Sequence, residues 1–401
     1  MYEIVRTARG AEPGAPAILF VGHAGLPNGF SRVLHSLLRH LPPGWDLHHF
    51  ATNLIPGAPA LPERNPGWKL HRNPSPVLHS PEALASAIDE VQPAIVVVLE
   101  QAWVCHRLAP ALSGPRRFRS IFYAAIDQPD AVSPPVAEQL ARLDCAVVFT
   151  EFAREILLSA FARWSIAPPA VRVIPHGVDN HLFFSVPRRE ARQVLFPDRP
   201  DLHDAFLILN ANRNQPFKRI DLTMRGFAQF VAGKPDHVKL YLHMANRPAA
   251  DGERPLADVL GIRDRILGLA SGARHPEIPS ERLNLLYNAC DVGINTAQRE
   301  GWGLIALEHA AARVAQIVPG YGSGQELWHD AAWLLNEPVT PESVAHALEA
   351  IYSDPQLRER LALAGYRNAT QSRYSWSSIA RCWDQLFREL IERSPKRANS
   401  A

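Results

Sequence analysis

The sequence predicts an α/β protein made of two units of similar size, each a parallel β-sheet wrapped by helices. Three observations support this prediction. Short apolar runs without polar alternation, such as the AILFV of residues 17–21, are typical of strands that are buried on both faces. These runs alternate with amphipathic stretches along the whole chain. The alternation restarts near residue 184, and 401 residues at roughly 150 per domain allow two large domains.

The first unit is predicted over residues 1–182. It begins with the strand at 17–21, a turn from Gly22 to Gly29, and a helix over 31–40. Ser80 has the position of an N-cap before a proline, which predicts a helix that starts there and ends before residue 93. Thr150 has the same capping role for a later helix. Further strands are predicted over residues 95–99, 121–126, 146–149 and 171–174.

The second unit is predicted over residues 183–375, with the same rhythm of strands and helices. A separate terminal segment, residues 376–401, holds a helix over about 376–391 and a frayed tail. Strands are predicted in the second unit over residues 206–209, 238–243, 292–295, 315–318 and 332–335. Helices are predicted over residues 219–231, 283–288 and 304–312, and another is capped by Thr340.

Composition excludes several classes of protein. The 42 Lys and Arg side chains nearly balance the 40 Asp and Glu, a net charge of +2, which disfavours a nucleic-acid partner held by bulk charge. A hydrophobic share of 47% excludes a disordered chain. The four cysteines are widely separated, which argues against disulfides and a zinc cluster. Without an apolar run long enough for a leader or a membrane span, we expect a soluble cytoplasmic protein.

Doubly wound sheets bind ligands beyond the carboxyl ends of their strands, so two such units are expected to face a central cleft. Three turns are candidates for that position. The first, Gly22 to Gly29, lets backbone N–H groups and a helix N-terminus approach a phosphate. A plain connecting loop remains an alternative interpretation of this turn. A nicotinamide-dinucleotide site is disfavoured because the glycine spacing of that motif is missing.

The second turn, Asn210 to Arg219, carries Arg213, Lys218 and Arg219 directly after a strand. A planar guanidinium and a mobile ammonium together suit a diphosphate. A solvated loop that opens a helix is the alternative. However, basic side chains are unfavourable at a helix N-terminus, so the cations of this turn are predicted to have an anionic partner.

The third turn, from Glu300 to Glu308, places Gly301 and Gly303 where a helix begins. The glycines free backbone N–H groups for a phosphate, and two carboxylates can accept hydrogen bonds from hydroxyl groups. This combination indicates a polyhydroxylated anion such as a sugar nucleotide. The alternative is that Glu300 is a helix-start acid favoured by the helix dipole and that Glu308 is a surface residue.

The EGWGL core with a second Glu after seven residues resembles the signature of retaining glycosyltransferases of the GT-B fold, the large family 4 and its relatives. The order of the other motifs is also similar. These motifs are the first Gly-bearing turn, IPHGVD, Arg213 and Lys218 five residues apart, YNACDVGINT, and a terminal helix after YSW. The resemblance extends from about residue 17 to residue 392.

The resemblance implies two Rossmann-like domains, the first on the acceptor side and the second on the donor side, with the C-terminal helix packed back on the first. The donor is expected to be a UDP- or GDP-linked hexose. Arg213 and Lys218 would neutralise its diphosphate, and Gly29 would approach it by its backbone. Glu300 would bind sugar hydroxyls and Glu308 the ribose. Backbone N–H groups of the glycine-rich turn would complete the phosphate site, namely those of Gly301, Trp302, Gly303 and Leu304.

The resemblance further implies retention of anomeric configuration without a metal or other cofactor, and an acceptor that is a glycan, a lipid-linked molecule or a small molecule. Many relatives carry a His where this chain has Asp127, so Asp127 is the candidate for polar contact with sugar or acceptor. A turn residue is the alternative interpretation of Asp127. His176 has two open interpretations, a structural histidine or a residue near the cleft.

Two further questions stay open at the level of sequence. The segment from Trp103 to Arg119 mixes apolar and basic residues, which allows weak peripheral membrane contact, although a solvated surface loop is favoured. The same fold also supports other functions. A nucleotide-sugar epimerase or hydrolase, or a non-catalytic partner subunit that binds a nucleotide sugar, would use a similar set of residues.

Overall fold

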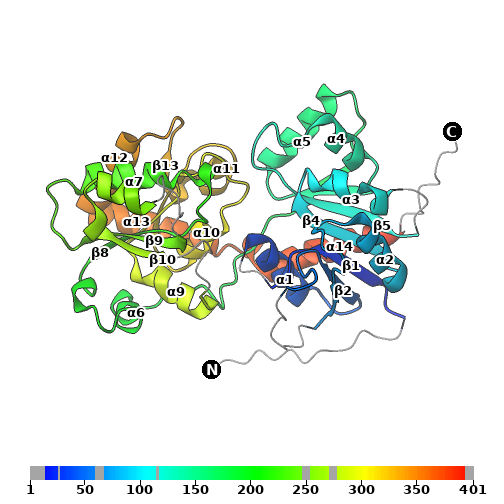
Figure 1. The fold of residues 1–401 in the computed structure, drawn as a ribbon, viewed down its shortest axis with the longest axis horizontal. Helices are drawn as coiled ribbons and strands as arrows, with labels where there is room; N and C mark the ends of the chain where they lie inside the picture. The colour runs from blue at the N-terminus through cyan, green and yellow to red at the C-terminus, as the bar shows by residue number, and fades with distance from the viewer. Residues whose placement is uncertain are drawn as a thin grey trace. The chain divides into compact units, whose positions relative to one another are not determined.

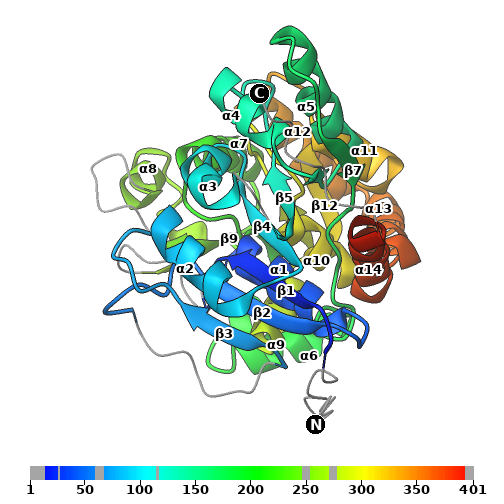
Figure 2. The ribbon, with the colours of Figure 1, turned by 90° about the vertical axis from the view of Figure 1, so that its right-hand side faces the viewer.

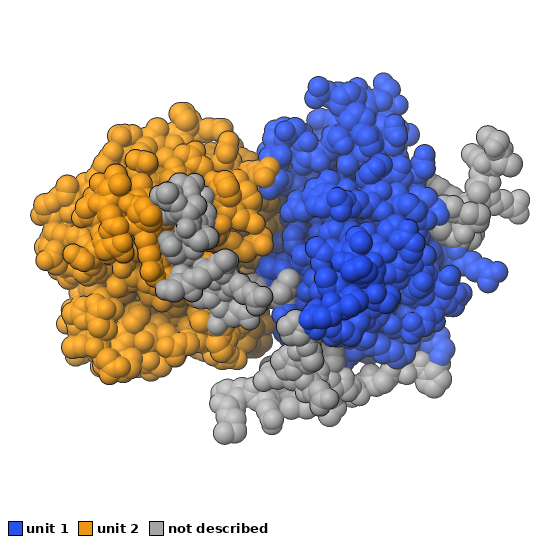
Figure 3. All heavy atoms as spheres, in the orientation of Figure 1, with its two compact units in different colours: residues 1–177, 376–401 blue, residues 178–375 orange. Residues whose placement is uncertain are grey.

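The chain forms two compact units in a computed structural model (Figure 1). The structure describes residues 14–25, 28–58, 67–113, 117–245, 253–270 and 278–392. Unit 1 comprises residues 1–177 and 376–401, and unit 2 comprises residues 178–375 (Figure 3). The first crossing therefore follows Gly177, whereas the sequence predicts it after residue 182. Val178 is already tied to unit 2, because its N–H donates to the carbonyl of Tyr374 at 2.9 Å.

Unit 1 is built on a seven-stranded parallel sheet. Its strand order is β3-β2-β1-β4-β5-β6-β7, so the winding direction changes between β1 and β4. Apolar runs form the central strands because both faces of the sheet are covered by helices. The strands are β1 (Ala17–Gly22), β2 (Asp46–Ala51), β3 (Lys69–Arg72), β4 (Ile95–Gln101), β5 (Arg119–Ala125), β6 (Cys145–Val148) and β7 (Ala170–Val173).

Alternate residues of the central strands face opposite helical layers. Leu19 and Val98 belong to a core with the inward faces of α2 to α5, whereas the ring of Phe20 meets Phe387 of α14. Figure 2 shows α2 and α3 on one side of these strands and α14 on the other. The helices of unit 1 are α1 (Gly29–His40), α2 (Pro81–Val91), α3 (Val104–Leu112), α4 (Pro134–Ala141), α5 (Glu151–Arg163) and α14 (Trp376–Glu392).

Unit 2 repeats this plan with a six-stranded parallel sheet. The order β10-β9-β8-β11-β12-β13 again reverses its winding, here between β8 and β11. Such a reversal leaves a crevice outside the carboxyl ends of the two strands, which is where ligands bind in open α/β sheets. The strands are β8 (Phe206–Asn210), β9 (Val238–Ala245), β10 (Ile266–Ala270), β11 (Val292–Ile294), β12 (Ala315–Pro319) and β13 (Trp333–Leu335).

Helices cover the second sheet as they cover the first. Gly226 of α7 illustrates how closely they pack, since a Cβ there would overlap with the side chain of Val344 of α12. The helices are α6 (Arg188–Leu195), α7 (Ile220–Val231), α8 (Glu253–Val259), α9 (Ser280–Ala289), α10 (Leu304–Ala311), α11 (Ser323–Trp328), α12 (Pro341–Ser353) and α13 (Pro355–Ala369). Short 3-10 turns are η1 (Pro200–Leu202), η2 (Pro216–Lys218), η3 (Arg263–Arg265), η4 (His329–Ala331) and η5 (Ser372–Tyr374).

The predicted doubly wound architecture is confirmed, and so is each strand expected from an apolar run. The side chains of Ser80, Thr150 and Thr340 accept the expected N-cap hydrogen bonds. Strands β2, β3 and β10 and helices α3, α4, α6, α8, α11 and α13 were not predicted. Polar residues explain two of these omissions, because the sequences DLHHFA of β2 and KLHR of β3 lack an apolar run. Among the described residues, no helix is long and apolar enough to cross a bilayer.

Candidate functional site

A cluster of polar side chains lies where β8 and β11 end, at the winding reversal of unit 2. The loop after β8 leads into η2, which carries Lys218, and the loop after β11 carries Glu300. These two residues are 82 positions apart in the sequence, yet Lys218 Nζ lies 2.6 Å from Glu300 Oε2. Their side chains are 12% and 19% exposed, so the pair is largely withdrawn from solvent.

The predicted anionic partners of the basic turn are therefore carboxylates of the chain itself. Glu300 pairs with Lys218, and Asp221 pairs with Arg219 at 2.9 Å. Arg219 has a left-handed backbone with φ of 49° and precedes α7 as its N-cap. Arg213 lies on the same loop with an exposed side chain, which is accessible to an anion from solvent.

A chain of three asparagines supports the carboxylate of Glu300. Asn295 Nδ2 donates to Glu300 Oε2 at 3.1 Å, and Asn295 Oδ1 accepts from Asn212 Nδ2 at 3.3 Å. Asn212 in turn donates to Asn210 Oδ1 at 3.0 Å. All three asparagines are buried. Sequence reasoning missed this chain of amides, although an Asn at the end of each of two strands, β8 and β11, was a visible signal.

The glycine-rich turn holds the backbone between Glu300 and α10. Gly303 has φ of 81°, a left-handed conformation, and is the N-cap residue of α10. The carbonyl of Glu300 accepts a short hydrogen bond from Ser323 Oγ. Trp302 is buried with its ring 5.5 Å from that of Tyr374. The turn is thus held at Glu300 and at Trp302, between which lies Gly301, and Leu304 begins α10.

Glu308 is not a surface residue, which overturns that alternative interpretation. It lies inside α10 with 2% of its surface exposed, and the hydroxyl of Tyr287 donates to its Oε2 at 3.2 Å. Burial of a carboxylate costs free energy unless it is hydrogen-bonded, so Tyr287 stabilises Glu308 in this position.

Gly29, Asp127 and His176 belong to unit 1. Gly29 opens α1, and Asp127 follows β5. His176 is buried, with its Nδ1 2.7 Å from the hydroxyl of Tyr123 and its ring packed against Phe149. Burial lowers the pKa of His176 to about 3, so its imidazole is neutral. Of its two interpretations, these contacts favour the structural one.

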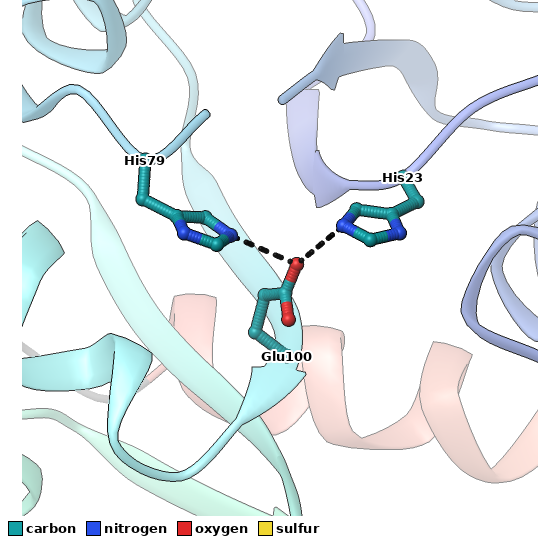
Figure 4. A group of neighbouring side chains, drawn as sticks. All are labelled: His23, His79 and Glu100. Atoms are coloured by element: carbon teal, nitrogen blue, oxygen red, sulfur yellow. Dashed lines mark hydrogen bonds and ion pairs between the residues drawn. The ribbon is translucent and has the colours of Figure 1, made fainter. Parts of the chain in front are cut away.

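Unit 1 has its own polar cluster where β1 and β4 diverge, and sequence reasoning missed it. Nε2 of His23 and Nε2 of His79 both lie 3.2 Å from Glu100 Oε1, and Figure 4 shows the two rings converging on that oxygen. Burial tends to raise the pKa of Glu100, but hydrogen bonds from His23 and His79 outweigh it and lower the pKa to about 2. The carboxylate is therefore an anion at neutral pH.

These three residues could hold a metal ion by residue type, but their hydrogen bonds do not fit one. Asn28 Oδ1 accepts the backbone N–H of Ser31 at 2.9 Å, so the Asn28 amide nitrogen faces His23 Nδ1 at 3.1 Å as a donor. His23 Nδ1 therefore accepts this hydrogen bond, and Nε2 is the nitrogen that donates to Glu100. A nitrogen that carries a proton has no lone pair for a metal, and the cluster instead joins the loops of His23 and His79 to the end of β4.

The segment from Trp103 to Arg119 contains the whole of α3 and the first residue of β5. Trp103 is 48% exposed and Arg107 lies over its ring at 5.2 Å, whereas Arg119 pairs with Asp144 at 3.2 Å. Arg116 lies outside the described residues. The membrane contact considered from sequence stays a prediction.

Residues 197–368 match the model of the family described as Glycosyl transferases group 1. The chain is 29% identical over 298 residues to a D-inositol 3-phosphate glycosyltransferase of Stackebrandtia nassauensis, an alignment that covers 70% of this chain and 63% of the relative. A protein of the same name from Thermobispora bispora is 29% identical over 57% of this chain and 52% of the relative. The chain thus spans less than two thirds of the length of these relatives.

Two solved structures are similar in fold over nearly the whole chain. Sucrose-phosphate synthase from Thermosynechococcus elongatus superposes with a TM-score of 0.74 at 20% identity, covering 94% of this chain and all of that one. Anabaena Alr3699/HepE in complex with UDP-glucose superposes with a TM-score of 0.72 at 16% identity, covering 93% of this chain and all of that one. The fold is GT-B, two Rossmann-like α/β units in one chain.

Proposed function

From the match of residues 197–368 to the model of the glycosyl transferases group 1, we propose that this chain transfers a hexose from a nucleotide diphosphate sugar to a hydroxyl group of an acceptor, with retention of anomeric configuration. The observation that carries the proposal is the contact between Lys218 and Glu300 at the winding reversal of unit 2. This contact places Lys218, the cation proposed for the leaving phosphate, next to Glu300, the carboxylate proposed for the sugar hydroxyls.

Each group has a distinct chemical role in this proposal. When the bond between sugar and diphosphate breaks, negative charge grows on the leaving oxygen, and Lys218 and Arg213 stabilise it. Glu300 accepts hydrogen bonds from the sugar, and Glu308 from the ribose. Backbone N–H groups from Gly301 to Leu304, with the N-terminus of α10, receive the phosphate. Because these cations and dipoles neutralise the diphosphate, we expect turnover without a metal ion.

Unit 1 is proposed to supply the acceptor side, with Asp127 in polar contact with sugar or acceptor and the backbone of Gly29 toward the diphosphate. The nucleotide is proposed to be UDP or GDP. A thermal-shift series with UDP, GDP, ADP and their sugars identifies it, because a ligand that binds only the folded state raises the melting temperature.

The proposed roles are tested with Glu300→Gln and Lys218→Met, which keep side-chain size while removing charge. We expect either variant to lower transfer at least about 100-fold, since each removes a charge that acts at the reacting centre. Lys234→Ala is the matched control, because Lys234 also pairs with a carboxylate of unit 2, Glu349, at 2.7 Å. Its activity is expected to equal that of the wild type.

Near wild-type transfer by both site variants would contradict the proposal. Incubation of the enzyme with donor alone is the accompanying measurement. Release of free sugar at the rate of transfer, or conversion to an epimer, would identify a hydrolase or an epimerase instead.

A further inference from the structure

We propose that Asn295 is a positioning residue that holds the carboxylate of Glu300 in place for the donor sugar while Lys218 moves to the diphosphate. The inference rests on the proposed function, in which Glu300 binds the sugar. Asn295 directly follows β11 and is 6% exposed, and its amide lies between Glu300 and the buried Asn212.

The hydrogen bonds of Asn295 leave its side chain one orientation. Its Oδ1 accepts the backbone N–H of Ala297 at 3.0 Å and the Nδ2 of Asn212 at 3.3 Å. The oxygen is thereby fixed on the side of Ala297, and Nδ2 is the atom that faces Glu300 Oε2 at 3.1 Å. The amide therefore acts as a donor toward the carboxylate.

Asn295 is itself held by the more deeply buried end of the chain of amides. Asn210 Oδ1 accepts both the backbone N–H of Asn212 at 3.1 Å and its side-chain Nδ2 at 3.0 Å. Asn210 Nδ2 donates to Thr223 Oγ1 at 3.0 Å, inside α7. Asn210 is fully buried and Asn212 is 3% exposed, and buried amides held by several hydrogen bonds have little freedom to reorient.

Lys218 and Asn295 both donate to Glu300, but a bound diphosphate is expected to affect only the contact of Lys218. Lys218 and Asn295 both contact Oε2, and neither engages Oε1. A diphosphate attracts the ammonium of Lys218, which is on a flexible stem, and so weakens its contact with Glu300. Asn295 carries no charge and is anchored on its far side, so it keeps Oε2 in place. Oε1 then remains available to accept a sugar hydroxyl.

Two substitutions separate this role from a purely structural one. Asn295→Asp keeps an oxygen that accepts from Ala297 and Asn212, but it replaces the donor to Glu300 by a second carboxylate. Asn295→Ala removes every contact. Asn368→Ala is the matched control, because Asn368 is also buried in unit 2 and donates to the carbonyl of Leu327 at 2.8 Å, outside the site.

The measurements are kcat and KM for donor, with UDP-glucose, GDP-mannose and ADP-glucose as probes, and the inhibition constant of the matching free nucleotide. Loss of a hydrogen bond to a charged group corresponds to about a 10- to 100-fold fall in kcat/KM. We expect that fall for Asn295→Asp and Asn295→Ala, with the inhibition constant of the free nucleotide changed less than about twofold. Asn368→Ala is expected to lower the melting temperature but to leave kcat/KM near that of the wild type.

Three results would overturn the inference in distinguishable ways. Equal losses of activity in Asn295→Asp and Asn368→Ala would indicate a structural role for both asparagines. Wild-type kcat/KM in Asn295→Asp would show that Glu300 needs no such support. A wild-type protein that neither binds nor turns over any of the three donors would instead refute the proposed function, on which the inference depends.

Discussion

Single residues set the electrostatics of the candidate donor site. A largely buried Lys218 and a largely buried Glu300 would each be costly alone, and together they are a neutral pair. A diphosphate must therefore compete with Glu300 for Lys218. Arg213 has an exposed side chain, and an exposed guanidinium can meet an anion before that exchange takes place.

Gly303 is the residue whose backbone conformation shapes this site, and Gly303→Ala tests it. Its φ of 81° is a left-handed conformation, which costs about 1–2 kcal/mol for a residue with a Cβ. The strain is expected to move the turn and weaken nucleotide binding, measured by calorimetry. Gly233→Ala is the control, because Gly233 has φ of 74° and a Cβ added there would have no neighbouring atom within 4 Å.

Both glycine variants are expected to lose similar stability, since the backbone strain is similar. Only Gly303→Ala is expected to lose affinity for the nucleotide. If Gly233→Ala weakened binding as much, the effect would come from general loosening of unit 2 rather than from the turn.

At the scale of elements, α14 shows that membership of a unit does not follow chain order. This helix comes after all of unit 2 but supplies core side chains to unit 1. Trp383 is fully buried, with its ring 4.9 Å from that of Tyr123 and 5.6 Å from that of Phe387. Asp384 accepts from the indole of Trp45 at 2.7 Å. The resemblance to family members implied this return of the helix, and the structure confirms it.

Trp383→Ala is expected to destabilise unit 1 selectively. Removal of a buried tryptophan costs about 3–5 kcal/mol because it leaves a cavity. Hydrogen exchange measured by mass spectrometry should show lost protection in unit 1 and little change in unit 2. Trp164→Ala is the control, since Trp164 is 37% exposed on the same unit. Loss of protection mainly in unit 2 would contradict this assignment of α14.

At the scale of the whole molecule, and among the residues that the structure describes, the two units differ in how many histidines have a pKa that burial lowers to about 4 or below. Burial is the largest cause that lowers the pKa of His35 to about 4 and those of His49 and His176 to about 3, all in unit 1. In unit 2, burial likewise lowers the pKa of His309 to about 3. A histidine with a lowered pKa stays neutral in the folded state and takes up a proton on unfolding below about pH 6.5.

Acid is therefore expected to weaken unit 1 more than unit 2. Stability from these histidines is fully present above about pH 6.5 and is lost as the pH falls toward their folded pKa values. Each histidine contributes about 1.4 kcal/mol of free energy of unfolding for each step of one in pH. For each such step, the three histidines of unit 1 together cost it up to about 4 kcal/mol of stability, and the one of unit 2 costs it about 1.4 kcal/mol. Hydrogen exchange at pH 7 and pH 5, corrected for intrinsic rates, measures both units in one sample. Equal losses would refute the prediction.

Much of the fold was predictable because local sequence carries it. Apolar runs mark strands that two helical layers cover, and capping residues such as Ser80 and Thr340 mark where helices begin. Edge strands were not predictable in the same way. In β3 the side chains are largely exposed, so no apolar run was needed there. Helix α3 contains Pro110 near its end, which masks the helical pattern.

The sequence by itself determined that two parallel sheets form and that basic and acidic turns follow particular strands, because both depend on residues close together in the chain. Only the tertiary structure decided which turns meet. The strand order brings the ends of β8 and β11 together, and with them Lys218, Asn295 and Glu300. It likewise joins His23, His79 and Glu100 in unit 1. Such contacts depend on which strands are neighbours in the sheet, and local sequence patterns do not specify that order.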